Sequence, residues 1–207
     1  MAEWLGRGLQ NLVQQFESAR YLRIVKKPSE TQEAFCVSGT PKNISMLEII
    51  QITNKSNPEE IEQVKSLFRE YANWLSVDLS FQRFEEEMLA LPDNYASPEG
   101  ALFMAKVDGQ PAGCVAVRRF DNSTCEMKRL FVRDAYKGHG VGKALAGKAI
   151  EAGKELGYHR MLLDTLAHMR PAIELYTALG FQPIAAYYDN PISNAVYLSM
   201  MLEEDHL

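Results

Sequence analysis

The sequence predicts an α/β (α+β) fold in which a mixed, mostly antiparallel sheet carries helices on both faces. Apolar segments arranged as a hairpin come first, and a strand–helix–strand succession follows in the second half of the chain. The 207 residues, of which 46% are hydrophobic and 24% charged, suit one soluble globular domain with a few tens of residues left over.

The residues outside the expected domain lie at the N-terminus. Residues 4–16 place apolar side chains at helical spacing with several Gln between them, which predicts an amphipathic helix. Residues 28–44 have a linker-like composition, so we expect an extension over residues 1–45 and a domain over residues 46–207. The helix could lie on a membrane surface, act as a dimerisation arm, fold against its own domain or be ill-ordered. Its polar face has more Gln than Lys or Arg, which favours the last two.

The first elements of the domain are a strand and two helices. Residues 47–53 predict the strand. Asn57, Pro58 and Glu60 form the pattern of an N-cap, a first helical proline and a capping box, so a helix begins here. A second helix is expected over residues 81–91, ended by the proline that follows.

A hairpin follows these helices. Residues 101–107 and 111–120 are apolar segments joined by Asp108-Gly109, and Asp-Gly supplies the positive φ angles that tight hairpin turns require. A polar turn then leads into a further strand over residues 125–132.

Beyond residue 132 strands and helices alternate, which predicts a strand–helix–strand unit. The elements expected there are a glycine-rich loop (136–142), a helix to about Leu156, a strand (161–165), a helix from Pro171 to Leu179, and two strands (184–188 and 195–201).

Composition and residue spacing exclude several classes of function. A formal net charge of -5 argues against nucleic acid or an anionic membrane as a partner, and no apolar run approaches the ~20 residues of a membrane span. Three widely spaced cysteines and four histidines without ligand spacing predict neither a disulfide framework nor a metal site. The N-terminus lacks the order of a signal peptide, so we expect a cytoplasmic protein.

The glycine-rich loop has the features of an anion-binding site. Gly138, Gly140 and Gly142 alternate at a strand-to-helix junction, where glycine lets backbone amides approach a ligand and the helix dipole favours negative charge. Their spacing fits neither the GxxxxGK[ST] phosphate loop nor the dinucleotide GxGxxG motif. A solvated basic helix entry is the alternative, but three glycines make such an entry costly. The basic residues that favour a polyanionic ligand are Lys128, Arg129, Arg133, Lys137 and Lys143.

The segment Lys137-Gly138-His139-Gly140-Val141-Gly142 resembles the Arg/Gln-x-x-Gly-x-Gly/Ala motif of the GNAT superfamily of acyl-CoA N-acyltransferases, with Lys in the first place. The strand from Glu126 to Val132 before it, and the segments Ala172–Tyr176 and Gly180-Phe181 after it, match the family's order and spacing. The resemblance covers residues 47–202 and implies the GNAT fold, in which a splayed pair of strands forms the cofactor cleft. It also implies acetyl-CoA as the cosubstrate, an amine as the acceptor, and no metal.

Positions that match the motifs imply the contacts with the cofactor. The backbone of Val132 would pair with the pantetheine arm, and the Leu130 amide, next to a bulge, would face the thioester carbonyl. Met169 stands where many family members have an Asn that contacts the cofactor. The residues implied in cofactor binding are Leu130, Phe131, Val132, Lys137, Gly138, His139, Gly140, Val141, Gly142 and Lys143, the last six through amides that would take the pyrophosphate.

Two residues are candidates for catalysis. The resemblance places Tyr176 near the cofactor sulfur, where a phenol can donate a proton to the leaving thiolate; alternatively, it is a core tyrosine on an apolar stripe. Glu126 is the candidate base, or the group that attracts a cationic amine. It could equally be a strand-end carboxylate paired with Lys128 or Arg118.

The leading hypothesis is an acetyl-CoA-dependent N-acetyltransferase that transfers the acetyl group directly to a primary amine of a small molecule or protein. A non-catalytic acyl-CoA-binding module and an acyl-thioester hydrolase are the alternatives. Cys114 and Cys125 have no neighbouring His, so we expect buried strand cysteines rather than acyl carriers. We expect residues 58–91, 92–100 and 187–190 to build the acceptor side. Family members are often dimers, so the resemblance is compatible with a homodimer.

Overall fold

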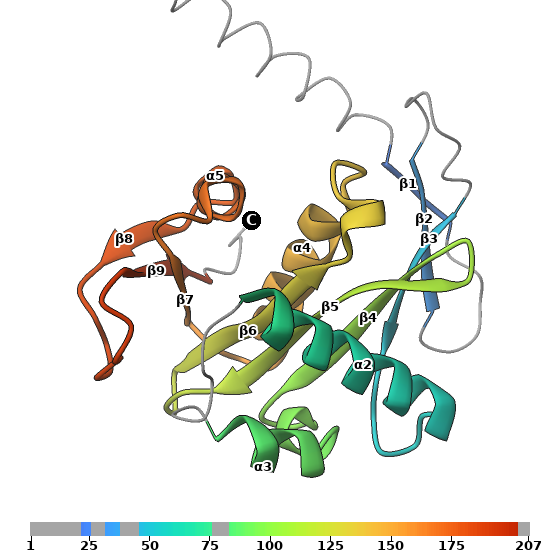
Figure 1. Cartoon of the computed structure of the whole chain (residues 1–207), viewed down its shortest axis with the longest axis horizontal. Helices are drawn as coiled ribbons and strands as arrows, with labels where there is room; N and C mark the ends of the chain where they lie inside the picture. The colour runs from blue at the N-terminus through green and yellow to red at the C-terminus, as the bar shows by residue number, and fades with distance from the viewer. Residues whose placement is uncertain (1–21, 26–31, 38–45, 76–82, 203–207) are drawn as a thin grey trace, which may run out of the picture.

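The structure is a computed structural model that describes residues 22–25, 32–37, 46–75 and 83–202, the first two ranges through their backbone alone. Within these ranges nine strands form one sheet in the order β1-β2-β3-β4-β5-β6-β7-β9-β8 (Figure 1). The strands are β1 (Leu22–Val25), β2 (Gln32–Val37), β3 (Leu47–Gln51), β4 (Ala101–Val107), β5 (Gln110–Arg119), β6 (Thr124–Val132), β7 (Arg160–Leu166), β8 (Gln182–Ile184) and β9 (Ala195–Met201).

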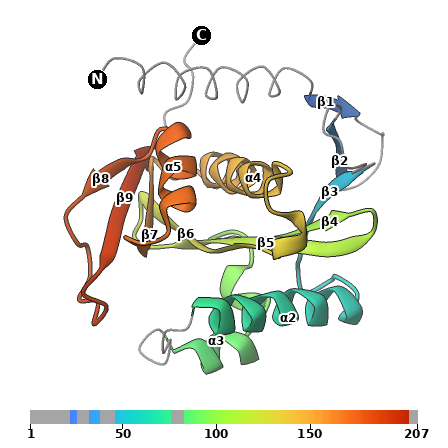
Figure 2. The same ribbon diagram turned by 45° about the horizontal axis from the view of Figure 1, so that its top comes forward.

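Helices cover both faces of this sheet, as the sequence predicts. Figure 2 shows α2 and α3 on one face and α4 and α5 on the other. Each face has its own apolar core. Val64, Leu67 and Phe68 of α2 are buried in one core, and Leu145 and Ala149 of α4 are buried in the other. The helices described are α2 (Pro58–Leu75), α3 (Phe84–Leu89), α4 (Val141–Glu155) and α5 (Arg170–Ala178), with short 3-10 turns η3 (Asp93–Tyr95) and η4 (Asp134–Tyr136).

The start of α2 follows from its capping residue. Asn57 Oδ1 accepts a hydrogen bond from the Glu60 amide over 3.1 Å, which confirms Asn57 as the N-cap. The Glu60 carboxylate accepts from Lys106 Nζ of β4 over 3.0 Å, so it ties the first turn of the helix to the sheet.

The hairpin of β4 and β5 has the turn that its sequence predicts. Asp108 and Gly109 both have positive φ angles, of 50° and 78°, as a tight turn between two twisted strands requires. The two strands pair antiparallel from Ala101↔Val117 to Val107↔Gln110, with one register shift between Ala105 and Lys106.

The strand–helix–strand unit is β6, α4 and β7. All other neighbouring strands pair antiparallel, and β6 and β7 pair parallel because α4 carries the chain back to the starting edge. Gly157 follows α4 with φ 81°, the left-handed conformation that commonly ends a helix.

Three expectations differ from the structure. The predicted strand 184–188 is displaced: β8 covers Gln182–Ile184, so its pairing with β9 begins earlier in the chain and ends at Ile184. The helix expected over 81–91 is shorter, since α3 begins after Arg83, whose φ of 57° is not helical, and ends at Leu89. The segment expected as a linker contains β2, which pairs with β3. The helix expected over residues 4–16 lies outside the described residues.

In the described part of the chain, every helix is too short or too polar to cross a membrane.

Candidate active site

The central feature of the site is the separation of β6 from β7. The two strands pair at Thr124↔Arg160, Cys125↔Met161 and Glu126↔Leu162, and their parallel ladder ends there. β6 continues to Val132 with β5 as its partner. A gap therefore opens between β6 and β7 beyond Glu126, which confirms the splayed strand pair.

A bulge in β6 lies beside this gap. The register of β5 and β6 shifts between Cys114 and Ala116, so Arg129 and Leu130 together oppose Val115. Arg129 has φ 57°, a left-handed conformation that is uncommon for a residue other than glycine. Leu130 follows directly and its side chain lines the gap, in agreement with the predicted bulge.

The side chain of Arg129 anchors the bulge to the neighbouring helix. Its Nε donates to Glu87 Oε1 of α3 over 3.0 Å, and its Nη2 pairs with Glu87 Oε2 over 2.5 Å. Tyr95 also donates to Glu87, and the Phe84 ring lies 5.4 Å from the Arg129 guanidinium carbon. Burial alone would lower the pKa of Arg129, but its bonds to Glu87 raise that pKa above the ordinary value. Arg129 thus keeps its charge, and its bonds to Glu87 hold the left-handed backbone in place.

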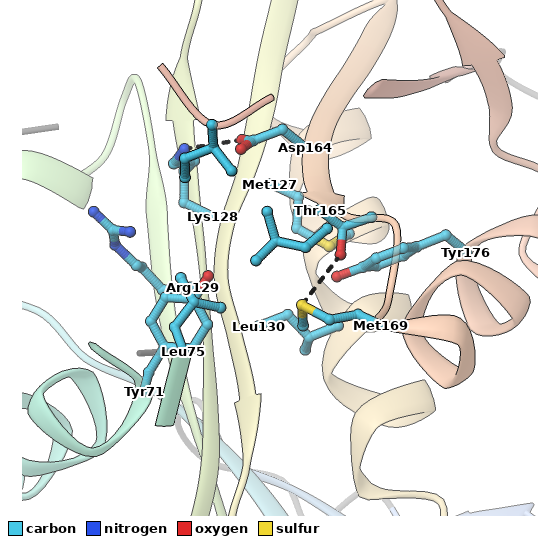
Figure 3. A pocket seen from close by; sticks show the side chains of 12 residues that line it. Tyr71, Leu75, Met127, Lys128, Arg129, Leu130, Asp164, Thr165, Met169 and Tyr176 are labelled. Atoms are coloured by element: carbon cyan, nitrogen blue, oxygen red, sulfur yellow. Dashed lines mark hydrogen bonds and ion pairs between the residues drawn. The ribbon is translucent and has the colours of Figure 1, made fainter. Parts of the chain in front are cut away.

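A cavity occupies the gap, and Tyr176 of α5 points its hydroxyl into it (Figure 3). Burial raises the pKa of Tyr176 well above 10, so the phenol keeps its proton at neutral pH. Thr165 of β7 donates to the sulfur of Met169 over 3.7 Å, and both side chains line the same cavity. The cavity lining is Tyr71, Leu75, Met127, Lys128, Arg129, Leu130, Asp164, Thr165, Leu166, Met169, Tyr176 and Ile192.

Glu126 lies in a neighbouring pocket rather than in this cavity. Its Oε2 accepts from Arg118 Nε over 2.8 Å and Nη2 over 2.7 Å, and its Oε1 accepts from Tyr187 over 2.7 Å. Burial would raise the pKa of Glu126, but the charges of Lys128 and Arg118 outweigh it and hold that pKa below its ordinary value. Glu126 is therefore an ionised carboxylate with several partners. The pocket lining is Arg83, Arg118, Phe120, Glu126, Lys128, Tyr187, Tyr188 and Asp189.

Lys128 connects the pocket and the cavity, and its partner Asp164 lines the cavity; the sequence did not point to this pair. Lys128 lines both spaces, and its Nζ lies 3.2 Å from Asp164 Oδ1 and 3.5 Å from Glu126 Oε1. Asp164 Oδ2 also accepts from the Tyr188 hydroxyl over 3.1 Å. The sequence contains one indication that Asp164 is functional, because it is the single charged residue in the apolar segment 161–165.

The glycine-rich loop and the start of α4 form a surface that can hold an anion. Gly138 and Gly140 have φ angles of 79° and 80°, and a Cβ atom at either position would meet no other atom within 4 Å. The hydrogen bonds of α4 begin with the Ala144 amide, which donates to Gly140 O over 3.0 Å. The amides of residues 141–143 precede this bond, as the first amides of a helix do, and remain available to a ligand. The Nδ1 atom of His139 is buried in the same loop with no hydrogen-bond partner.

The basic cluster predicted around this loop is largely neutralised by carboxylates from distant segments. Arg133 forms two bonds to Glu70 of α2, over 2.8 and 2.7 Å, while Arg129 binds Glu87 and Lys128 binds Asp164. Lys137 pairs with Asp134 over 2.5 Å and lies 4.6 Å above the Trp74 ring. The positive field around the loop is therefore weaker than the residue types along the chain suggest, because three of the five cations have partners on other elements. Lys143 is exposed at the start of α4.

The implied cofactor residues on β6 do not share one orientation. Leu130 faces the cavity, and Val132 lies against Gly142, whose Cβ position would be 3.6 Å from Val132 Cγ2. The Phe131 ring points to the opposite face, where it contacts Tyr71 at 6.1 Å between ring centroids. Only the backbone of Phe131 is therefore available to a ligand in the gap.

Neither of the described cysteines is placed for nucleophilic chemistry. Cys114 and Cys125 are buried free thiols on β5 and β6, as expected. Burial raises the pKa of Cys114 well above its ordinary value and that of Cys125 to about 12, so both stay protonated. Among the described residues no cluster of three or more His, Cys, Asp or Glu side chains is arranged to hold a metal ion.

The chain is similar to proteins of one family. Residues 64–181 match the family described as "Acetyltransferase (GNAT) family". An uncharacterized N-acetyltransferase of Schizosaccharomyces pombe is 36% identical over 166 residues, which cover 79% of this chain and 98% of that protein. An uncharacterized N-acetyltransferase of Dictyostelium discoideum is 32% identical over 207 aligned positions, covering 70% and 96% respectively.

Solved acetyltransferase structures share the fold. An acetyltransferase of Streptococcus agalactiae superposes with a TM-score of 0.63 at 21% identity, over 75% of this chain and 98% of that chain. An acetyltransferase of the GNAT family from Staphylococcus aureus superposes with a TM-score of 0.61 at 20% identity, over 76% and 99%.

Proposed function

Because the chain belongs to the GNAT acetyltransferase family and is an acyltransferase, we propose that it transfers the acetyl group of acetyl-CoA directly to a primary amine of a small molecule or protein. The observation that carries this proposal is the gap between β6 and β7, which has the glycine-rich loop near one end and the Tyr176 hydroxyl inside it. No other described feature combines an anion-binding helix start with a proton donor in a cavity.

The described residues fit acetyl-CoA, which supplies the activated acetyl group as a thioester. The unpaired edge of β6 beyond Glu126 offers backbone groups to the pantetheine arm, with Val132 and the Leu130 amide as the proposed contacts. The open space at Gly138 and Gly140, together with the first amides of α4, offers a place for the pyrophosphate. Met169 lines the cavity at the position where many family members have an Asn that contacts the cofactor. Its thioether replaces the hydrogen-bonding amide of that Asn, so the contact with the cofactor is apolar here.

Two side chains are assigned roles in the transfer. Tyr176 donates its phenolic proton to the sulfur when the carbon–sulfur bond breaks, and its raised pKa keeps that proton available at neutral pH. Glu126 was the candidate base or the group that attracts a cationic amine. Its lowered pKa and its bonds to Arg118 and Tyr187 favour an electrostatic role over proton transfer.

Calorimetry with acetyl-CoA tests the cofactor assignment. We expect micromolar binding by the wild-type protein and its loss in Gly140→Glu, which adds bulk and negative charge to the proposed anion site. Gly157→Glu is a matched control, because Gly157 also has positive φ and open space but lies beyond the other end of α4. Absence of wild-type binding, or equal loss in both variants, would refute the assignment.

Measuring the release of free CoA distinguishes the proposed transferase from two alternatives. These are a non-catalytic acyl-CoA-binding module and a thioester hydrolase. A transferase releases CoA only when an amine acceptor is present, a hydrolase releases it without one, and a binding module releases none. A cytoplasmic location and a homodimer remain predictions from the sequence.

A further inference from the structure

The gap between β6 and β7 passes through the sheet and reaches both faces. Tyr176 packs with the core under α4, whereas Tyr71 and Leu75 of α2 pack with the core on the opposite face. All three side chains line the same cavity, and Figure 3 shows them on its two sides. If the proposed acyl donor lies along α4, the acceptor approaches from the face of α2 and α3.

A pocket on the face of α2 and α3 leads into this gap through Lys128, which lines both. Three of the eight residues that line the pocket are aromatic and the other five are charged. The rings of Phe120 and Tyr187 meet edge to face at 5.4 Å, and Tyr187 contacts Tyr188 at 5.3 Å. Such walls suit a small organic molecule rather than a bare ion.

Glu126 does not offer its charge freely to a cation in this pocket. Its carboxylate is 2% exposed and is paired with Arg118 and Lys128, while Tyr187 donates to it as well. A polyamine entering the pocket would meet the cations Arg118 and Lys128 as well as the exposed carboxylate of Asp189.

Two groups that flank Glu126 retain hydrogen-bonding capacity. Arg118 on β5 uses Nε and Nη2 for Glu126, its side chain is 48% exposed, and a guanidinium has five N–H donors in all. Asp164 on β7 accepts one bond at each carboxylate oxygen, from Lys128 and Tyr188, and each oxygen can accept another. The pocket thus has a cationic group at Arg118 and the gap has an anionic group at Asp164, which is paired with Lys128, a residue that lines both spaces.

Strand order places these two groups on the strands that flank β6. β5, β6 and β7 are consecutive in the sheet, and Arg118, Glu126 and Leu162 are register partners across them. Paired backbones two strands apart are separated by roughly 10 Å, which applies to Arg118 and Leu162, and Asp164 lies two residues further along β7, beside the gap. Side chains that reach inward from both strands leave a span of the size of an amino acid.

We propose that the acceptor is a zwitterion of amino-acid size, whose ammonium group binds at Asp164 beside the cavity and whose carboxylate binds Arg118. This inference rests on the proposed acetyl transfer, for which it names the class of acceptor. The ammonium first releases one proton to water, and the nitrogen then forms a bond to the acetyl carbon. The carbon–sulfur bond of the thioester breaks as the sulfur takes the Tyr176 proton and leaves as a thiol, and the second proton lost by the nitrogen restores the phenol through water. Amines without a carboxylate lack the added bond to Arg118 and are poorer acceptors.

Matched acceptors test the proposal through thiol release. Amino acids such as leucine and tyrosine are each measured beside the amine that lacks only the carboxylate, isoamylamine and tyramine. We expect kcat/KM to favour the amino acid by roughly ten- to hundredfold, as a charge-assisted hydrogen bond would. Equal or higher kcat/KM for the decarboxylated amines overturns the proposal, and so does a lack of turnover with every amino acid tested.

Substitutions of Arg118 test whether this residue causes the preference for amino acids over amines. Arg118→Gln should bring the ratio of kcat/KM for the amino acid to kcat/KM for the matched amine close to one, and Arg118→Lys, which keeps the charge beside Glu126, should give an intermediate ratio. Arg69→Gln, at an exposed position of α2, is the control and should keep the wild-type preference. A preference that survives in both Arg118 variants overturns the assignment.

Acetyl-CoA binding separates failure of this inference from failure of the proposed function. If calorimetry shows binding and only amines without a carboxylate are acetylated, the transferase stands and the zwitterion proposal is wrong. If acetyl-CoA does not bind, the proposed function itself is wrong.

Discussion

Lys128 Nζ lies 3.2 Å from Asp164 Oδ1, and this ion pair joins β6 to β7 just where their backbone ladder ends. The last backbone pair is Glu126↔Leu162, two residues before each member of the ion pair. A side-chain contact therefore replaces the next step of the ladder and sets the width of the gap at its narrow end. Lys128 and Asp164 are mostly buried, so water weakens this contact little.

Tyr176→Phe should lower kcat by about a hundredfold or more, since general acid catalysis contributes at least that much and a phenyl ring has no proton to donate. Acetyl-CoA affinity should stay nearly constant because the ring and its contact with Phe181 remain. Steady-state thiol release and calorimetry measure the two quantities. Tyr158→Phe, whose hydroxyl binds Glu99 O on another part of the surface, serves as the control. An unchanged kcat in Tyr176→Phe would exclude this tyrosine as the acid.

Glu87→Gln should reduce the free energy of unfolding by about 3–5 kcal/mol, because it leaves the buried Arg129 guanidinium without its counter-charge. The neighbouring Glu86→Gln removes an exposed pair with Arg83 and should cost at most about 1 kcal/mol. Urea denaturation of both variants gives the comparison. Similar losses in the two variants would show that the anchor of the bulge contributes no special stability.

Acid should destabilise the protein through Glu126. Burial works against its ionised form, but Lys128 and Arg118 hold its folded pKa below the ordinary 4.5. The ionised carboxylate therefore stabilises the fold above pH 4.5, and this contribution disappears as the pH falls through the lowered folded pKa. Thermal unfolding of wild type should lose Tm more steeply below pH 4.5 than that of Glu126→Gln. Parallel curves for the two proteins would contradict this account.

Two glycines of α4 should respond in opposite directions to alanine. Gly147 has open space where a Cβ would lie, so Gly147→Ala should raise the free energy of unfolding by roughly 1 kcal/mol through helix propensity. A Cβ at Gly153 would lie 2.8 Å from Met161 Cε and 2.9 Å from Leu202 Cδ1, so Gly153→Ala should lower it by about 1–3 kcal/mol. Chemical denaturation measures both changes. A stabilised Gly153→Ala would show that these side chains move aside at little cost.

Local signals in the sequence predicted much of the fold. Asn57 before Pro58 determined where α2 begins, and Asp108-Gly109 determined the β4–β5 turn, because capping and positive φ depend on few neighbouring residues. The strand near residue 184 was displaced because its bounds depend on pairing with β9, which local composition does not specify.

The site was predictable only in part for the same reason. Glycine spacing located the loop before α4, and the family resemblance selected Tyr176, which does line the cavity. The partners of Arg129, Arg133 and Lys128 arrive from α3, α2 and β7, so a count of charges along the chain overstated the free positive charge. Arg118 entered the sequence analysis only as a partner of Glu126, and its place beside a pocket required the strand order.

The short parallel ladder between β6 and β7 also has a consequence for the rates of amide hydrogen exchange on its two sides. Three residue pairs join β6 to β7 in the described sheet, whereas β7 and β9 pair along seven positions. We therefore expect the amides of β7, β9 and β8 to exchange faster than those of the central strands β4, β5 and β6, although their side chains share one core. Any ligand that bridges the two sets of strands stabilises the fold as a whole, because it binds the closed arrangement and not the opened one.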